Sequence, residues 1–146
     1  MNKTEILNII KSALNEKIDK LQNLIDETRA SNNDNKSSMG DKYETGREML
    51  QQQINNLQIQ LNEMLKQQNS LKTIFDKASD KAEKGAMVQT EKGWFYIAVS
   101  LGEIYFMEYK IFVISPESPL ATAMNGKREG ENFSLNSVNQ KIINII

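Results

Sequence analysis

Apolar residues recur every seven positions along the start of the chain. Leu7, Leu14 and Leu21 form one row of this repeat, and Ile10 and Leu24 occupy the interleaved row. A lysine interrupts the second row at position 17, where the apolar residue at position 18 compensates for it. This spacing is typical of a coiled coil, in which each helix buries a narrow seam, and not of the broad apolar face of a globular helix. The segment is therefore predicted to be a long coiled-coil helix.

The same repeat returns after a polar break. Residues 31–40 read SNNDNKSSMG, and beyond them the repeat resumes in two rows. One row holds Ile54, Leu61 and Phe75, and the other holds Leu50, Leu57, Met64 and Leu71. Because Asn, Ser and Gly favour chain reversal, the break predicts a turn within Ser31–Gly40 and an antiparallel hairpin over residues 1–80. The alternative is an intermolecular coiled coil.

A turn at this place also predicts which residues of the two segments meet. Leu24 would lie opposite Leu50, and Leu14 would lie opposite Leu61. The outward positions of the second segment are mostly Gln and Asn, without a second apolar stripe. The hairpin is therefore expected to project into solvent.

After residue 85 the hydrophobic pattern changes to a period of two. The charged residues 76–84 are expected to be a fraying helix end and a linker, with Gly85 as the stop. Apolar residues alternate over 94–101, a second extended run over 104–114 turns near 107–109, and shorter runs occupy 133–135 and 142–146. Residues 85–146 are predicted to form a small antiparallel domain of four or five strands. The fold class is thus α+β.

One short helix is marked out within this domain. Ser118 is a suitable N-cap, Pro119 suits the first helical position, and Gly126 suits the position just after the helix. The helix is therefore predicted to run from residue 119 to about residue 124.

Composition excludes several classes of function. The chain has 146 residues and a net charge of -1, too little excess charge to bind nucleic acid by electrostatics alone. Neither Cys nor His occurs, which excludes disulfides, Ser-His and Cys-His catalysis and zinc sites of the His/Cys type. No apolar run reaches the ~18 residues that a membrane span needs, and no signal peptide is evident. We expect a cytoplasmic protein that contacts no membrane.

The segment Ser115–Glu131 resembles the C-terminal signature of the bacterial Gre transcript-cleavage factors. That signature reads S-x-x-S-P-[IL]-[AG]-x-A-[LM]-x-G-[KR]-x-x-G-[DE], and every fixed position is present in this chain. Gly40 and Asp41, followed three residues later by Glu44, resemble the tip motif of the same family. The two motifs together imply an N-terminal coiled-coil hairpin and a C-terminal FKBP-like domain.

The resemblance implies a function on backtracked RNA polymerase. In the family, the C-terminal domain docks at the rim of the secondary channel, and the hairpin reaches through the channel to the active site. The chain would then stimulate Mg²⁺-dependent cleavage of the nascent RNA at its 3′ end, without being an enzyme by itself. Ser118, Pro119, Lys127 and Arg128 are the docking residues that the resemblance implies.

Asp41 and Glu44 are the candidate metal-binding and catalytic residues. Mg²⁺ is commonly held by one or two carboxylates together with phosphate oxygens, so this pair could share an ion with the polymerase. The same two residues also suit a capping box that starts the second helix, and both roles can hold at once.

The tip departs from the family pattern and carries further candidate contacts. Lys42 stands where an apolar residue is usual, and Gly46 lowers helix propensity by ~1 kcal/mol. Candidate contacts with RNA or polymerase are Lys36, Lys42, Tyr43 and Arg47. For the charged residues among them, a solvated helix face is the simpler interpretation.

Three functions from different classes remain open at this point. The first is a Gre-like cleavage factor. The second is a secondary-channel regulator that does not promote cleavage, and the third is a coiled-coil adaptor or holdase. The preference for short or long backtracked RNA does not follow from the sequence, and neither does the oligomeric state.

Overall fold

A computed structural model describes the chain except for residues 39–43 and 75–76, and describes side chains outside residues 33–45 and 75–76. Its contacts divide the chain into two compact units. The hairpin unit is Ala13–Gln68, and the sheet unit combines Met1–Ser12 with Asn69–Ile146. The first twelve residues therefore belong with the strands, an association that the composition shift near residue 85 did not indicate.

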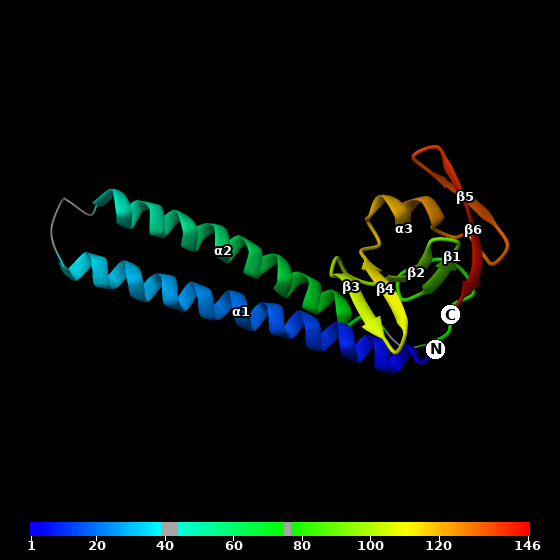
Figure 1. The fold of residues 1–146 in the computed structure, drawn as a ribbon, viewed down its shortest axis with the longest axis horizontal. Helices are drawn as coiled ribbons and strands as arrows, with labels where there is room; N and C mark the ends of the chain where they lie inside the picture. The colour runs from blue at the N-terminus through cyan, green and yellow to red at the C-terminus, as the bar shows by residue number, and fades with distance from the viewer. Residues whose placement is uncertain (39–43, 75–76) are drawn as a thin grey trace. The chain divides into compact units, whose positions relative to one another are not determined.

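Two long helices form the hairpin unit. Helix α1 spans Lys3–Ser38 and α2 spans Glu44–Leu71, and the two lie side by side through this unit (Figure 1). Their shared core consists of buried Ile25, Ile54, Leu57 and Leu61, with Ile18 and Leu21 packed against it. Since residues from both helices enter one core, the predicted helical hairpin is confirmed.

The turn is not where the polar break predicted it. Residues 31–38 continue α1 as helix, so a turn in that part of Ser31–Gly40 is wrong, and residues 39 and 40 lie outside the described residues. Asn, Ser and Asp cost only a few tenths of a kcal/mol each in a helix interior, and the stretch contains no Pro. A helix already formed over residues 3–30 can therefore propagate through such a stretch.

The predicted register between the helices is wrong for the same reason. Gln68 donates a hydrogen bond from Nε2 to Asn15 Oδ1 at 2.7 Å. The predicted turn would have placed Asn15 opposite a residue of α2 about two helical turns before Gln68. Leu24, predicted in the seam, is 41% exposed, and Ile25 is fully buried instead. A straight helix has 3.6 residues per turn, slightly more than the 3.5 of a heptad repeat. Once Ile18 takes the place of Lys17 in the seam, the buried row therefore stays one position later, at Ile25 and not at Leu24.

Helix α2 keeps the predicted heptad seam and ends earlier than expected. Ile54, Leu57, Leu61 and Leu71 are buried as the repeat requires, while Phe75 lies outside the described residues. The backbone N–H groups of residues 72, 73 and 74 each bond to the carbonyl three residues before, which tightens the last turn. The described residues 77–85 contain turns and bends and no helix. They therefore form the linker, and the fraying helix end expected there is not present in them.

The sheet unit contains six strands in its described residues. The strands are β1 (Met87–Thr90), β2 (Gly93–Ile97), β3 (Gly102–Phe106), β4 (Tyr109–Ile114), β5 (Asn132–Leu135) and β6 (Val138–Ile145). Their order in the sheet is β3-β4-β2-β1-β6-β5. Neighbours are antiparallel except β2 and β4, which are parallel because the β3–β4 hairpin returns β4 beside β2. The α+β class is confirmed, with one parallel pair in an otherwise antiparallel sheet.

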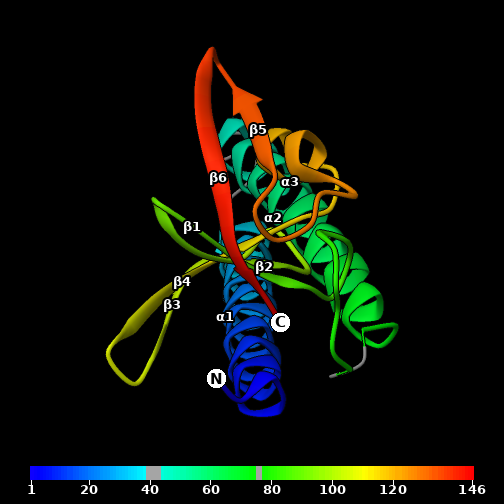
Figure 2. The same cartoon turned by 90° about the vertical axis from the view of Figure 1, so that its right-hand side faces the viewer.

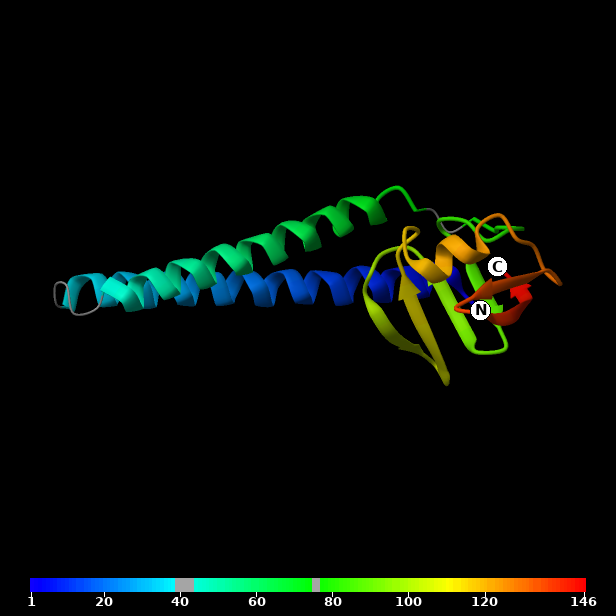
Figure 3. The same ribbon diagram turned by 90° about the horizontal axis from the view of Figure 1, so that it is seen from above.

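Helix α3 (Pro119–Met124) covers one face of the sheet (Figure 3). Ala121 and Met124 from this helix share a buried core with Phe95, Ile97 and Ile142 from the strands. The rings of Phe95 and Phe112 stack with centroids 5.5 Å apart. The opposite face of the sheet is also buried, so β2 has buried side chains on both of its sides.

The first turns of α1 cover the face of the sheet opposite to α3. Ile6 and Ile10 are fully buried, and the start of the chain lines one cavity together with Trp94 and Phe106 of the sheet. Lys3 is 5% exposed and donates hydrogen bonds from Nζ to the main-chain oxygens of Lys77 and Ile146, at 2.9 and 3.0 Å. These charge-assisted bonds hold the start of α1 to both ends of the segment that carries the sheet. Figure 2 shows the two ends of the chain close to each other.

The turn type of the β5–β6 hairpin can be tested by mutation. Asn136 and Ser137 have φ of 51° and 66°, as a two-residue type I′ turn requires, and Gly is preferred at the second position. We expect Ser137→Gly to raise the free energy of unfolding by about 0.5 kcal/mol, because the left-handed strain is relieved. Urea denaturation measures the change. The control Ser134→Gly, within strand β5, should lower stability by ~0.5–1 kcal/mol, and stabilisation by both variants would contradict the assignment.

Candidate functional site

Of the two candidate carboxylates, Asp41 lies between the two long helices in sequence, and Glu44 is the first residue of α2. Helix α1 ends at Ser38 and α2 begins at Glu44, so Asp41 belongs to the segment that joins them. Asp41, Lys42 and Tyr43 lie outside the described residues, as do the side chains of Lys36 and Glu44. The capping box and the metal-binding pair therefore remain predictions from the sequence.

Two residues of the first turn of α2 are described. Gly46 is exposed, and a Cβ added to it would meet no atom within 4 Å. Arg47 is half-buried. Packing therefore does not require glycine at position 46, and its effect is to weaken the helix next to Glu44.

The signature segment forms a capped helix. Ser118 is the N-cap of α3: its Oγ accepts a hydrogen bond from the Ala121 N–H at 3.2 Å and donates one to the Ser115 carbonyl at 2.7 Å. Pro119 occupies the start of the helix, where its missing N–H costs nothing. Gly126 has φ of 78°, a conformation that favours glycine after a helix. The predicted helix and its punctuation are confirmed.

The residues after this helix hold the linker. Ala82 donates its N–H to the Lys127 carbonyl and accepts from the Gly126 N–H, both at 2.8 Å. Arg128 Nη1 lies 2.6 Å from Asp80 Oδ2, and this hydrogen-bonded guanidinium lowers the pKa of Asp80 while the carboxylate raises the pKa of Arg128. The sequence did not single out Asp80 or Ala82, because only the fold brings the linker against this segment.

The end of the signature also serves the sheet. The Gly130 N–H bonds to the Ile142 carbonyl at 2.8 Å, and the Ile142 N–H bonds to the Glu131 carbonyl at 2.9 Å. Glu129 Oε1 accepts the Ile145 N–H at 3.0 Å. Much of the signature therefore has a structural role, while the side chain of Arg128 remains exposed and that of Lys127 half-buried.

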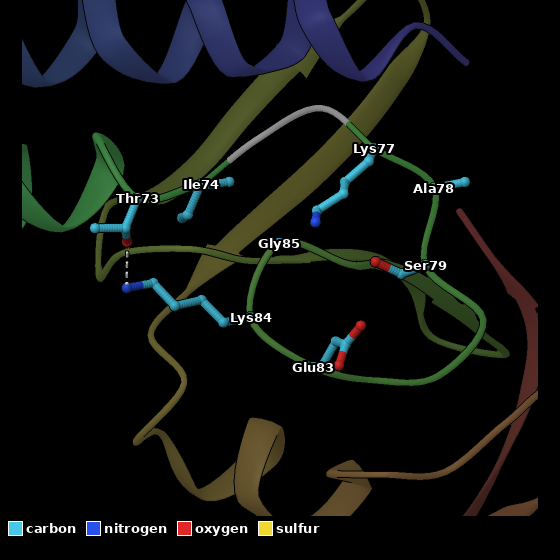
Figure 4. A pocket seen from close by; sticks show the side chains of 8 residues that line it. All are labelled: Thr73, Ile74, Lys77, Ala78, Ser79, Glu83, Lys84 and Gly85. Atoms are coloured by element: carbon cyan, nitrogen blue, oxygen red, sulfur yellow. Dashed lines mark hydrogen bonds between the residues drawn. The ribbon is translucent and has the colours of Figure 1, made fainter.

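A cavity of about 230 Å³ lies beside the linker (Figure 4). Lys77, Glu83 and Lys84 line it, and Lys84 Nζ donates a hydrogen bond to Thr73 Oγ1 at 2.9 Å. Glu83 also lies 3.9 Å from Lys81. Because ammonium and carboxylate groups face the same space, its charge selects no class of ligand.

Two features are absent from the described residues. Within residues 1–38, 44–74 and 77–146, no helix is long and apolar enough to cross a membrane. The same part of the chain holds no group of three or more His, Cys, Asp or Glu side chains that could bind a metal ion.

The described residues form a helical hairpin and a mostly antiparallel sheet with one short capped helix. The chain is similar to the crystal structure of GreA factor homolog 1 (Gfh1) of Thermus thermophilus, with 16% identity, a TM-score of 0.40 and coverage of 93% of this chain and 94% of that one. It is also similar to Gfh1 of Thermus aquaticus, with 15% identity, a TM-score of 0.35 and coverage of 90% of each chain.

A third structure, described as that of the transcription factor Gfh1, shares 13% identity over 92% of both chains, with a TM-score of 0.38. The first of the three is named as a GreA factor homolog, and all three carry the name Gfh1. No model of a protein family and no curated protein sequence matches the chain.

Proposed function

We propose that this protein is a Gre-like transcription factor that binds RNA polymerase and stimulates cleavage of backtracked RNA. The observation that carries the proposal is the complete match of Ser115–Glu131 to the Gre signature. In support, the residues of that match form the capped helix, the turn and the linker contacts described above. A chance match would not be expected to use its Ser-Pro and both of its glycines in one compact structure.

The chemistry is proposed to come from the tip carboxylates acting with the polymerase. Asp41 and Glu44 would share a Mg²⁺ ion that the polymerase active site already contacts, and such an ion positions and activates water for phosphodiester hydrolysis. Two carboxylates alone hold Mg²⁺ weakly, so the isolated chain should be inactive as a nuclease. Lys36, Lys42, Tyr43 and Arg47 are proposed to contact polymerase or the RNA 3′ end nearby.

A regulator without cleavage activity is the second candidate. It would share the fold and the partner, and the departures at the tip favour it. Lys42 places a positive charge next to Asp41, and Gly46 loosens the first turn of α2 without a packing reason. A coiled-coil adaptor, by contrast, would not depend on either carboxylate.

The test is to add the purified protein and Mg²⁺ to a stalled, backtracked elongation complex of the polymerase from the same organism. We expect a short RNA fragment released from the 3′ end, and no cleavage of free RNA by the protein alone. Binding without release would favour the regulator. Absence of any binding to the polymerase would contradict both candidates.

A further inference from the structure

The sequence contains one Asn-Gly pair, Asn125 and Gly126, and the pair lies at the end of α3. Asn-Gly is the sequence most prone to spontaneous deamidation, because glycine has no Cβ to keep its main-chain nitrogen away from the asparagine side chain. Asn125 is exposed, so water reaches its amide group. Both residues, and the linker beside them, belong to the sheet unit. The pair is therefore a candidate modification site within one compact body.

Deamidation at this pair needs no reactant other than water. The Gly126 main-chain nitrogen bonds to Cγ of Asn125, and the side-chain nitrogen leaves as ammonia with the proton that Gly126 gives up. Water then opens the resulting succinimide ring at one of its two carbonyls, which produces aspartate or isoaspartate. In isoaspartate the main chain runs through the former side chain and is one carbon longer. The reaction therefore requires a Gly126 nitrogen that is free and faces Asn125 Cγ.

The fold keeps this nitrogen from reacting. The Gly126 N–H donates a hydrogen bond to the Ala82 carbonyl at 2.8 Å, which engages the proton that must leave. Asn125 has ψ of 128°, a rotation that turns the Gly126 nitrogen away from the Asn125 side chain. Ring closure therefore requires the backbone to leave its native conformation and the bond to Ala82 to break.

The linker holds the end of α3 through more than this one bond. The Ala82 N–H donates to the Lys127 carbonyl at 2.8 Å, and the Ala82 side chain is fully buried in the core. Arg128 and Asp80 add a charge-assisted hydrogen bond between the same two segments. Because these contacts are adjacent along both segments, they are expected to open together. The Gly126 nitrogen becomes free when the linker detaches.

We propose that Asn125 is a deamidation site whose rate is set by detachment of the linker around Ala82 from the end of α3. The native rate is then the rate of the open segment multiplied by the fraction of molecules in which it is open. Isoaspartate cannot restore both hydrogen bonds of Ala82, because its longer main chain displaces Gly126 from Lys127. Modification therefore makes the detachment permanent. This inference does not depend on the proposed function.

The first experiment compares the full-length protein in native buffer and in guanidinium chloride at the same pH. Peptide mapping by mass spectrometry follows the conversion of Asn125 over time. We expect the conversion in native buffer to be at least about tenfold slower, because it waits for local opening. Equal rates in the two conditions would overturn the proposal. In Asn125→Gln, whose side chain is one carbon longer and closes a ring slowly, the modified peptide should not appear.

The second experiment tests the control by the linker. Asp80→Asn removes the carboxylate that pairs with Arg128 and leaves the sequence around Asn125 intact. We expect its native rate to rise about two- to fivefold, the scale of an exposed ion pair, and its rate in guanidinium chloride to match the wild type. The matched control Lys81→Gln removes a charge that lies 3.9 Å from Glu83, within the linker itself, and should keep the wild-type native rate. A native rate in Asp80→Asn equal to that of either the wild type or Lys81→Gln would overturn control by the linker.

Hydrogen exchange tests whether the detachment is permanent. In the unmodified protein the Ala82 N–H should exchange slowly, because it is bonded to the Lys127 carbonyl. Protein that carries isoaspartate at position 125, separated from the unmodified form by ion exchange, should exchange this N–H at least about tenfold faster. Equal exchange in the two forms would show that the linker reattaches and would contradict this part of the proposal.

Discussion

Replacing Asp41 by Asn should remove most Mg²⁺-dependent cleavage of backtracked RNA while leaving the affinity for RNA polymerase nearly unchanged. A carboxylate that acts on a metal ion in the transition state contributes to the rate and little to ground-state binding. We expect the cleavage rate to fall about 100-fold or more, the scale for losing one charge-stabilising group. Glu44→Gln should behave in the same way. Single-turnover cleavage of a stalled complex measures the rate.

Asparagine is chosen because it separates the two roles of Asp41. Asn caps a helix about as well as Asp, so a purely structural residue would tolerate the change, with a loss of at most ~0.5 kcal/mol. Gly46→Ala is the matched control at the same turn. It keeps both carboxylates, its added methyl group meets open space, and it should retain cleavage. If Asp41→Asn cleaves like the wild type, the pair only caps the helix, and the regulator without cleavage activity replaces our proposal.

The second large effect is expected in the hairpin unit, where two adjacent residues differ in burial. Ile25 is fully buried in the core shared by α1 and α2, whereas Leu24 is 41% exposed. Ile25→Ala should lower the free energy of unfolding by ~2–5 kcal/mol, because it leaves a cavity between the helices. Leu24→Ala should cost less than ~1 kcal/mol, since the exposed side chain loses little contact and Ala favours the helix.

Urea denaturation followed by circular dichroism measures both variants. The two sites lie in the same helical turn and receive the same residue, so the changes in helix propensity differ by only a few tenths of a kcal/mol, well below the expected difference in stability. Equal losses, or a larger loss for Leu24→Ala, would show that the strict heptad row describes the seam and that the helix does not shift its buried row after residue 18.

Local signals predicted most of the elements. The period of seven predicted both long helices, and Ser118, Pro119 and Gly126 predicted the ends of α3. The period of two predicted four or five strands where the described residues form six, and β1 was not expected. Each of these features depends on residues a few positions apart, whose spacing determines which side of a helix or strand they share. The candidate carboxylates were likewise found by a short motif.

Features that depend on distant residues were not predictable in this way. The register of α1 against α2 was wrong by about two turns, because the polar break looked like a turn while the helix propagates through most of it. The contact of Arg128 with Asp80 joins residues 48 positions apart, and nothing in the spacing of either residue indicates the other. The cavity that the start of the chain lines with Trp94 and Phe106 combines residues from three separate parts of the chain.

The sequence by itself determined the two kinds of structure and the capped helix. Each of these follows from local periodicity, from backbone preferences at Pro and Gly, or from a motif of contiguous residues. Only the tertiary structure decided the parallel pairing of β2 with β4, the burial of Ile25 in place of Leu24, and the place of residues 1–12 in the sheet unit. These outcomes depend on which distant surfaces bury the most apolar area together, and a pattern read along the chain contains no measure of that.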